Sequence, residues 1–222
     1  MIDISGFEGY IFDLDNTLLD SHSVWHDVDI KFFEKRNIVE PEDYARKVAT
    51  MNLDAAAAYT IERFGLNEKA EDITTEWFSM IEKEYAYNLK MFDGVAELLK
   101  RIHDGGGKLA LATATAHKLF APALIRNGVY DWFDAFATID ETGRGKDYSD
   151  VYYLAAERMG IIPQRCVVFE DIAIGVQSAK RAGMTTVAFL NSNAKKEWDF
   201  LKATADYTFT NYRDITYCVV NN

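Results

Sequence analysis

Two aspartates spaced two residues apart, Asp13 and Asp15, follow a run of bulky apolar residues and precede Thr17. Carboxylates this close repel each other unless a cation or a proton lies between them. The spacing therefore indicates a hard metal ion, a shared proton, or both. Aspartates at such a place also serve as turn formers or helix caps, so the rest of the chain has to decide between the two interpretations.

More polar residues follow other strand-like apolar segments of the chain. One segment ends in a threonine, another ends in a glutamate–aspartate pair, and a lysine lies in a glycine-rich turn before a predicted helix. In a parallel sheet the carboxyl ends of the strands share one rim, where ligands bind. We therefore expect these residues to meet the two aspartates at that rim: Thr113, Lys146, Glu170 and Asp171.

Carboxylates, a hydroxyl and an ammonium group together suit phosphoryl transfer. Carboxylates and substrate phosphate oxygens usually hold Mg²⁺, while the ion keeps several waters. One carboxylate can attack phosphorus and form an aspartyl-phosphate, and a second acid can protonate the leaving oxygen and then activate water. A hydroxyl, backbone N–H groups and a lysine can bind the oxygens of the transferred group.

The segments that must position these residues alternate between strands and helices, which predicts a parallel sheet with right-handed crossovers. Residues 24–87 interrupt the alternation, because apolar residues recur there at helical spacing. The expected fold class is therefore α/β: a Rossmann-like parallel sheet core, residues 1–20 plus 88–222, with an inserted all-helical cap, residues 21–87. The predicted strands are 9–13, 109–112, 136–138, 166–169, 185–190 and 207–209.

Helix ends within the cap are predicted from proline, glycine and capping residues. Pro41 is the expected first residue of one helix, because the N–H that proline lacks would have no intrahelical acceptor at that position. Asn52 is expected to cap the next helix, which ends near Gly65. The last helix is expected to begin at Asp72 or Thr74. The two links between cap and core are expected to act as hinges, with closure of the cap expelling water.

Composition excludes several classes of protein. The chain has 222 residues, of which 49% are hydrophobic, and a net charge of −11, which argues against coating nucleic acid or an anionic membrane. Its apolar runs are shorter than the roughly 18–20 residues of a membrane span. Two cysteines give no disulfide framework, and the first residues do not read as a signal peptide. We expect a cytoplasmic protein, a monomer or weak dimer, whose partner is a small-molecule phosphate ester.

The order of these motifs resembles that of the haloacid dehalogenase superfamily, in the branch with a helical cap that includes β-phosphoglucomutase and phosphoglycolate phosphatase. The family's first motif is Asp-x-Asp-x-Thr, as in residues 13–17, and its second is a strand-ending Ser or Thr, as at Thr113. The fourth is an acidic pair followed by glycine, as in residues 170–175. The third, Gly-Lys-Pro-x-Pro-Asp, corresponds to residues 145–150, which keep Lys146 but neither proline, so this turn is expected to be less rigid.

The resemblance implies a role for each matching residue. Asp13 would be the nucleophile and a Mg²⁺ ligand, and Asp15 would be the general acid/base, with its backbone carbonyl also on the metal. Asp171 would bind Mg²⁺, with Glu170 assisting either on the ion or one layer behind it. The phosphate-binding groups would be the Thr113 hydroxyl, the Ala114 amide and Lys146.

Several reactions remain open to such a site. Asp15 favours a phosphate ester over dehalogenation, which needs no acid at that position. Phosphonate hydrolysis in this family uses a cap lysine, and nothing around Lys47 identifies it as one. A β-phosphoglucomutase-like hexose-phosphate mutase would carry a histidine where Trp25 stands and an arginine in the cap loop 50–53, which has none. We therefore expect a Mg²⁺-dependent phosphatase acting on a small sugar-phosphate-like ester, with the mutase as the alternative.

Two non-enzymatic alternatives are also considered. Receiver domains use an aspartate, an acidic pair, a threonine and a lysine as a phosphorylation switch, but their motif order differs and they lack a large helical insert. The intact first motif argues against a non-catalytic binding module. Substrate identity is expected to lie in cap residues near the hinge and the cap loop: His22, Trp25, Met51 and Asn52.

Overall fold

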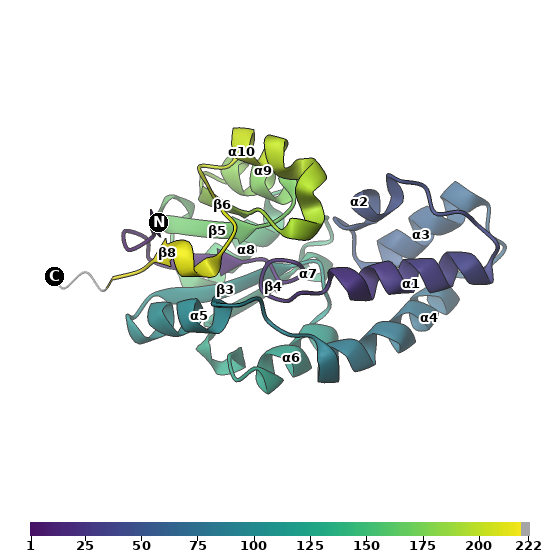
Figure 1. Ribbon diagram of the computed structural model, residues 1–222, viewed down its shortest axis with the longest axis horizontal. Helices are drawn as coiled ribbons and strands as arrows, with labels where there is room; N and C mark the ends of the chain where they lie inside the picture. Colours follow the sequence, from purple (N-terminus) through teal and green to yellow (C-terminus); the bar gives the residue numbers. More distant parts are fainter. Residues whose placement is uncertain (219–222) are drawn as a thin grey trace.

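The strand-like segments form a six-stranded parallel sheet in the computed structural model, which describes residues 1–218. In spatial order its strands are β4 (Ala135–Thr138), β3 (Lys108–Thr113), β2 (Gly9–Phe12), β5 (Cys166–Glu170), β6 (Thr185–Phe189) and β7 (Tyr207–Phe209). The predicted α/β class with a parallel sheet core is confirmed (Figure 1). The strand that carries the first motif, β2, lies in the middle, between β3 and β5.

Helices cover both faces of this sheet (Figure 1). On one face α8 (Asp150–Met159) and α9 (Ala173–Arg181) share a buried cluster with Ile11, and on the other α5 (Val95–Asp104) packs with Tyr10 and Phe12. Successive strand residues point to opposite faces of the sheet, and helices cover both faces. Every residue of β2 is therefore buried, and none of them is charged. The other core helices are α6 (His117–Arg126), α7 (Ile139–Thr142) and α10 (Trp198–Thr204).

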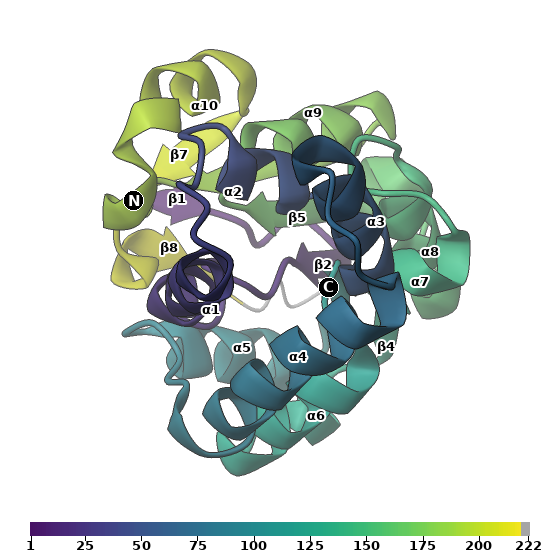
Figure 2. The same ribbon diagram turned by 90° about the vertical axis from the view of Figure 1, so that its right-hand side faces the viewer.

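The chain between β2 and α5 forms the helical insert that the sequence predicted. Figure 2 looks onto this cap, with the strands of the core behind it. The cap has its own aromatic packing: the ring of Phe32 lies 5.2 Å from that of Trp77, and the ring of Phe33 lies 4.8 Å from that of Tyr44. Its elements are α1 (His22–Lys35), α2 (Tyr44–Val48), α3 (Leu53–Phe64), α4 (Ala70–Lys83) and a π-helix (Glu84–Asn88).

Capping within the insert follows the sequence at α3 but not at α2 or α4. The Asn52 side chain accepts a hydrogen bond from the Ala55 N–H at 2.9 Å, and Gly65 ends α3 with a left-handed φ of 62°. The prediction that Pro41 starts a helix is wrong: its carbonyl accepts from the Tyr44 N–H at 3.0 Å, so it forms a turn before α2.

The predicted start of α4 is also wrong by several residues. The helix begins at Ala70, so Asp72 lies inside the first turn together with Glu71. Negative side chains in a first turn interact favourably with the partial positive charge of the helix N-terminus. Asp72 is therefore not the N-cap residue of α4; it stabilises the first helical turn instead.

A second, two-stranded parallel sheet pairs the two ends of the chain and was not predicted. It joins β1 (Ile2–Asp3) to β8 (Ile215–Thr216). Two residues are too few to show strand alternation, so the sequence pattern gave no signal. Short 3₁₀ turns complete the fold: Tyr130–Trp132, Pro163–Arg165, Ser192–Glu197 and Tyr212–Asp214. Over residues 1–218, every helix falls short of the length and apolar character that crossing a membrane requires.

Candidate active site

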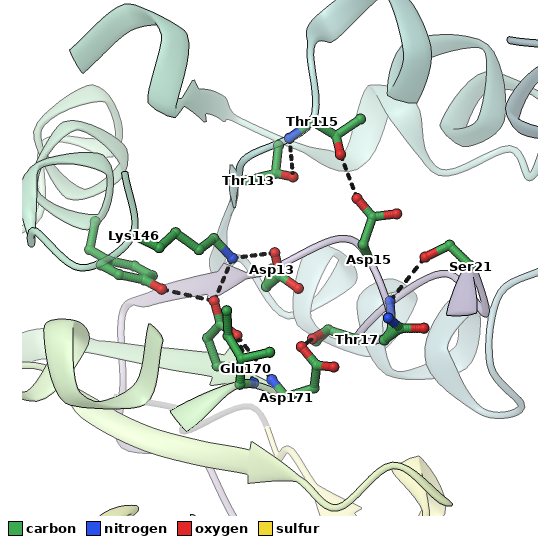
Figure 3. A network of polar contacts seen from close by, with 12 residues as sticks. Asp13, Asp15, Thr17, Ser21, Thr113, Thr115, Lys146, Glu170 and Asp171 are labelled. Carbon is green, nitrogen blue, oxygen red and sulfur yellow. Dashed lines mark hydrogen bonds and ion pairs between the residues drawn. The ribbon is translucent and has the colours of Figure 1, made fainter. Parts of the chain in front are cut away.

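The carboxyl ends of β2 and β5 bring the predicted acids together (Figure 3). Phe12 of β2 lies opposite both Leu111 of β3 and Phe169 of β5. The residues that follow are therefore neighbours, and the Asp13 N–H donates to the Phe169 carbonyl at 3.0 Å. The parallel register thus places Asp13 beside Glu170, and both side chains are buried.

The ammonium group of Lys146 lies between these two carboxylates. Its Nζ donates to Oδ1 of Asp13 and to Oε1 of Glu170, and the lysine side chain is 3% exposed. Burial alone would lower the pKa of Lys146, but the two carboxylates raise it above its ordinary value. The lysine is therefore a charged part of the centre and not a solvated surface group, which is the usual fate of lysine.

Side chains of α9 hold the turn that carries Lys146. The Ser178 hydroxyl donates to the Lys146 carbonyl at 2.6 Å, and Arg181 donates to the Asp147 carbonyl. The Ser149 hydroxyl in turn donates to the Ser178 carbonyl at 2.7 Å. These bonds fix the turn without the two prolines of the family motif, and so they offset the loss of rigidity expected from the sequence.

Both carboxylate oxygens of Glu170 accept hydrogen bonds from the chain. Its Oε1 accepts from the Tyr152 hydroxyl at 2.8 Å, and its Oε2 accepts from the N–H groups of Asp171 and Ile172 at 3.0 and 3.2 Å. A Cβ atom at Gly175 would lie 2.4 Å from the carboxyl carbon of Glu170. The glycine of the fourth motif is therefore needed because α9 passes too close to the acid for any side chain.

Three buried acids form a candidate metal centre. Asp13, Glu170 and Asp171 each place a carboxylate oxygen within 4.8 Å of the others. Burial raises the pKa of Asp13 to about 7 against the opposing effect of Lys146, and burial with repulsion from Asp13 and Glu170 raises the pKa of Asp171 well above its usual range. Lys146 supplies one positive charge for three carboxylates, so their full ionisation leaves buried negative charge uncompensated. A divalent cation that prefers hard oxygen ligands fits this donor set.

Asp15 lies where the core meets the cap. Its Oδ1 accepts hydrogen bonds from the Tyr85 hydroxyl and from the Trp25 indole N–H, the latter at 3.4 Å. Its Oδ2 accepts from the Thr115 hydroxyl at the end of β3. Trp25 also donates to the Tyr85 oxygen at 3.0 Å. Two cap side chains and one core side chain therefore orient the second aspartate of the first motif.

The turn after β2 links the first motif to the fourth. Asn16 takes a left-handed φ of 58°, and its N–H donates to the Ser21 hydroxyl at 3.2 Å. The Thr17 hydroxyl donates to Oδ1 of Asp171 at 3.4 Å, while the Thr17 carbonyl accepts from Tyr212 at 2.6 Å. The threonine of Asp-x-Asp-x-Thr thus has a structural role, because it ties this turn to the end of β5.

A cavity of about 590 Å³ lies between the cap and these strand ends. Of the residues predicted for the site, Glu170 is not part of the cavity wall; it is fully buried and contacts Lys146. The cavity brings together predicted residues of the core with those of the cap: Asp13, Asp15, Thr113, Ala114, Lys146, Asp171, His22, Trp25, Met51 and Asn52.

The tip of the cap loop touches the core at two places. The Thr50 carbonyl accepts from the Lys146 N–H at 3.3 Å, and a Cβ atom at Gly145 would lie 2.6 Å from that same carbonyl oxygen. The Asn52 amide donates to Oδ1 of Asp140 at 2.5 Å. The cap therefore rests directly on the turn that presents the lysine.

Several residues of the site were missed in the sequence. Tyr85 and Thr115, which both donate to Asp15, were not among the predicted site residues. Asp29 and Arg46 also line the cavity. The spacing of four residues between Trp25 and Asp29 was a usable signal, because such residues share one face of a helix. The loop 50–53 has no arginine, but α2 supplies one to the cavity wall.

The family of the chain follows from its match to known proteins. The model of the haloacid dehalogenase-like hydrolases matches residues 7–183, which is most of the chain and includes all four motifs. The chain therefore belongs to the haloacid dehalogenase-like hydrolase family, and the resemblance read from the motifs is confirmed.

Relatives of known name in this family include phosphatases. The phosphorylated carbohydrates phosphatase of Thermotoga maritima is 27% identical over 180 residues, which cover 81% of this chain and 83% of the relative. The fructose-1-phosphate phosphatase YqaB of Escherichia coli is 28% identical over 193 residues, covering 82% and 95%. Hexitol phosphatase A of Escherichia coli is 28% identical over 187 residues, covering 82% of each chain.

Solved structures share the whole fold, cap included. CbbY from Rhodobacter sphaeroides in complex with phosphate superposes with a TM-score of 0.78 at 22% identity, covering 93% of this chain and 95% of that one. β-Phosphoglucomutase from Clostridium difficile gives a TM-score of 0.79 at 19% identity, covering 95% and 94%. At such identities the likeness establishes the fold, which is the sheet core with an inserted helical cap.

Proposed function

We propose that this chain is a Mg²⁺-dependent phosphatase that hydrolyses a small phosphate ester of the sugar-phosphate type through an aspartyl-phosphate intermediate. The observation that carries the proposal is the meeting of Asp13, Lys146 and Asp171 at the floor of a cavity whose cap side touches Asp15. The relatives named as sugar and hexitol phosphatases support the same reaction class.

In the first half-reaction the Asp13 carboxylate attacks phosphorus, and the bond from phosphorus to the leaving oxygen breaks. Asp15 gives its proton to that oxygen, so the alcohol leaves neutral. In the second half-reaction Asp15 takes a proton from water, the water oxygen attacks phosphorus, and the bond to Asp13 breaks to release inorganic phosphate. Because Trp25, Tyr85 and Thr115 orient Asp15, the same group is positioned for both proton transfers.

The phosphoryl oxygens have donors at the end of β3 and at the lysine. The Thr113 oxygen accepts from the Thr115 N–H at 3.0 Å, which leaves its own proton for a phosphoryl oxygen. The Ala114 amide and Lys146 complete the proposed phosphate-binding set. The carboxylates of Asp13 and Asp171, with Glu170 beside them, would hold the divalent ion, which supplies positive charge against the phosphoryl oxygens when bound.

A hexose-phosphate mutase is the second candidate, because the structural neighbours include β-phosphoglucomutase and Arg46 reaches the cavity wall. The phosphatase is better supported. Trp25 stands where the mutase carries a histidine, and relatives that cover more than four fifths of the chain are named as phosphatases.

The test is turnover of p-nitrophenyl phosphate and a panel of sugar phosphates with and without Mg²⁺. Asp13→Asn should lower kcat by at least about 10³-fold, since it removes the nucleophile. Asp27→Asn, the same change on an exposed residue of α1 outside the cavity, is the matched control. Chelation should abolish turnover, and added Mg²⁺ should restore it. Interconversion of glucose 1-phosphate and glucose 6-phosphate faster than phosphate release would indicate the mutase, and a single stoichiometric phosphorylation would indicate a switch.

A further inference from the structure

The cavity extends well beyond the space that a phosphoryl group needs, and its far wall belongs to the cap. Asp29 lies on that wall, four residues after Trp25 on α1. Four residues advance a helix by roughly 6 Å along its axis. Trp25 touches Asp15, the group that serves the leaving oxygen, so Asp29 faces the part of a substrate that lies several bonds farther on.

The surroundings of Asp29 leave its carboxylate in need of hydrogen-bond donors. The side chain is partly buried, and among the described side chains, residues 1–191 and 195–218, it takes part in no hydrogen bond or ion pair. Tyr44 and Trp77 line the cavity with it, and Glu40 adds a second negative charge nearby. Burial, with a smaller contribution from Glu40, raises the pKa of Asp29 to about 7. A partly buried polar group of this kind is costly until a partner satisfies it.

Other charged groups on the cavity wall differ from Asp29. The Asp140 and Glu197 carboxylates already accept hydrogen bonds from neighbouring groups of the chain. Around Asp29 itself the facing titratable groups are Glu40, Tyr44 and His26, the last of which interacts with Glu40. Apart from the acids and the lysine at the strand ends, the remaining charged or titratable wall residues are exposed to solvent: His22, Arg46, Asp54 and Lys118.

We propose that Asp29 is a specificity-determining residue that selects an uncharged, polyhydroxylated leaving group of pentose or hexose length. Once Asp29 is ionised, above a pKa of about 7, hydroxyls several bonds from the ester oxygen donate to its carboxylate, and hydrogen bonds to a charged acceptor are the stronger kind. A substrate with a second phosphate or a carboxylate at that end meets the Asp29 carboxylate, with the charge of Glu40 behind the cavity wall, where screening by salt is weak, and is disfavoured. The proposal rests on the phosphatase function and names the substrate class of the same site.

The experiment compares kcat/KM for hexitol and hexose monophosphates, for hexose bisphosphate and for p-nitrophenyl phosphate, which has no hydroxyl to donate. In the wild type the hexitol monophosphate should be preferred over the bisphosphate. Asp29→Ala should lower the ratio of kcat/KM for hexitol phosphate to that for p-nitrophenyl phosphate about 10- to 100-fold, mainly through KM. Asp29→Asn, which keeps the shape but removes the charge, should raise kcat/KM for the bisphosphate relative to the monophosphate.

The matched control is Glu40→Gln, which removes a neighbouring charge from a residue outside the cavity wall and should keep the wild-type ratio of hexitol phosphate to p-nitrophenyl phosphate. Unchanged ratios in both Asp29 variants, or an equal fall for every ester including p-nitrophenyl phosphate, would overturn the proposal. A wild-type enzyme that hydrolyses p-nitrophenyl phosphate but prefers bisphosphates would refute the selectivity while leaving the phosphatase intact. A wild type inactive on every ester would refute both.

Discussion

Replacing Lys146 by methionine tests how much of the molecule's stability depends on the buried charges. Methionine keeps an unbranched side chain of similar length but removes the ammonium group that Asp13 and Glu170 share. The three side chains are 3%, 6% and 0% exposed, so the two carboxylates left behind have little access to water. Breaking a buried ion pair in this way costs about 3–5 kcal/mol. In a domain of this length that loss lowers the thermal midpoint by roughly 6–20 °C.

The assay is urea unfolding followed by circular dichroism, at pH 5.5 and pH 8, with and without Mg²⁺. The loss should be largest at pH 8 without metal, because the pKa of Asp13 is about 7 with the lysine present and rises further without it. Protonation at pH 5.5 removes much of the repulsion and should shrink the difference. The matched control is Lys196→Met, because its ion pair with Glu42 has side chains that are 84% and 85% exposed. It should leave the midpoint unchanged. A Lys146→Met loss below about 1 kcal/mol at pH 8 would refute the reasoning.

Three further substitutions test other parts of the site. Gly175→Ala should cost about 1–3 kcal/mol and weaken Mg²⁺ binding, measured by urea unfolding and calorimetry, because the new Cβ displaces Glu170; unchanged metal affinity would contradict this. Tyr85→Phe should lower kcat about tenfold with little change in KM, since Asp15 loses an orienting donor; a change in KM alone would argue for a substrate contact instead. Asp29→Asn should stabilise the fold above pH 7 by at most about 4 kcal/mol, and leave it unchanged near pH 4. The folded pKa of about 7 exceeds the ordinary 3.8, so the wild type loses stability as pH rises between them; equal pH profiles would contradict the burial of this group.

The core of the site could be predicted because its geometry follows from strand order alone. A polar residue that ends a buried parallel strand must lie at the common rim, so Asp13, Thr113 and Glu170 needed no knowledge of side-chain packing. Lys146 was harder, since it follows a turn and not a strand. Its position depends on Ser178 and Arg181, more than thirty residues away, and no local pattern announces such a contact.

Two polar residues of the cap wall, Asp29 and Arg46, were not predicted, for a different physical reason. A helix that lines a polar cavity shows polar residues both there and on its solvent face, so hydrophobic periodicity cannot separate the two. Asp29 and Arg46 therefore looked like ordinary surface residues. The Tyr85 ring is buried like that of an apolar core residue, but its hydroxyl donates to Asp15 from a π-helical turn that the sequence pattern did not show.

The contact between the cap loop and the turn that carries Lys146 couples the position of the cap to that of the lysine. The Thr50 carbonyl holds the backbone of Lys146, and it can approach this closely because Gly145 has no side chain to keep it away. Any opening of the cap that admits a substrate or releases a product breaks the hydrogen bond from Lys146, the residue that neutralises Asp13, to the Thr50 carbonyl. The lysine turn that neutralises Asp13 is thus held by the cap loop only while the cap is closed, and a bulkier residue at position 145 would push the two apart.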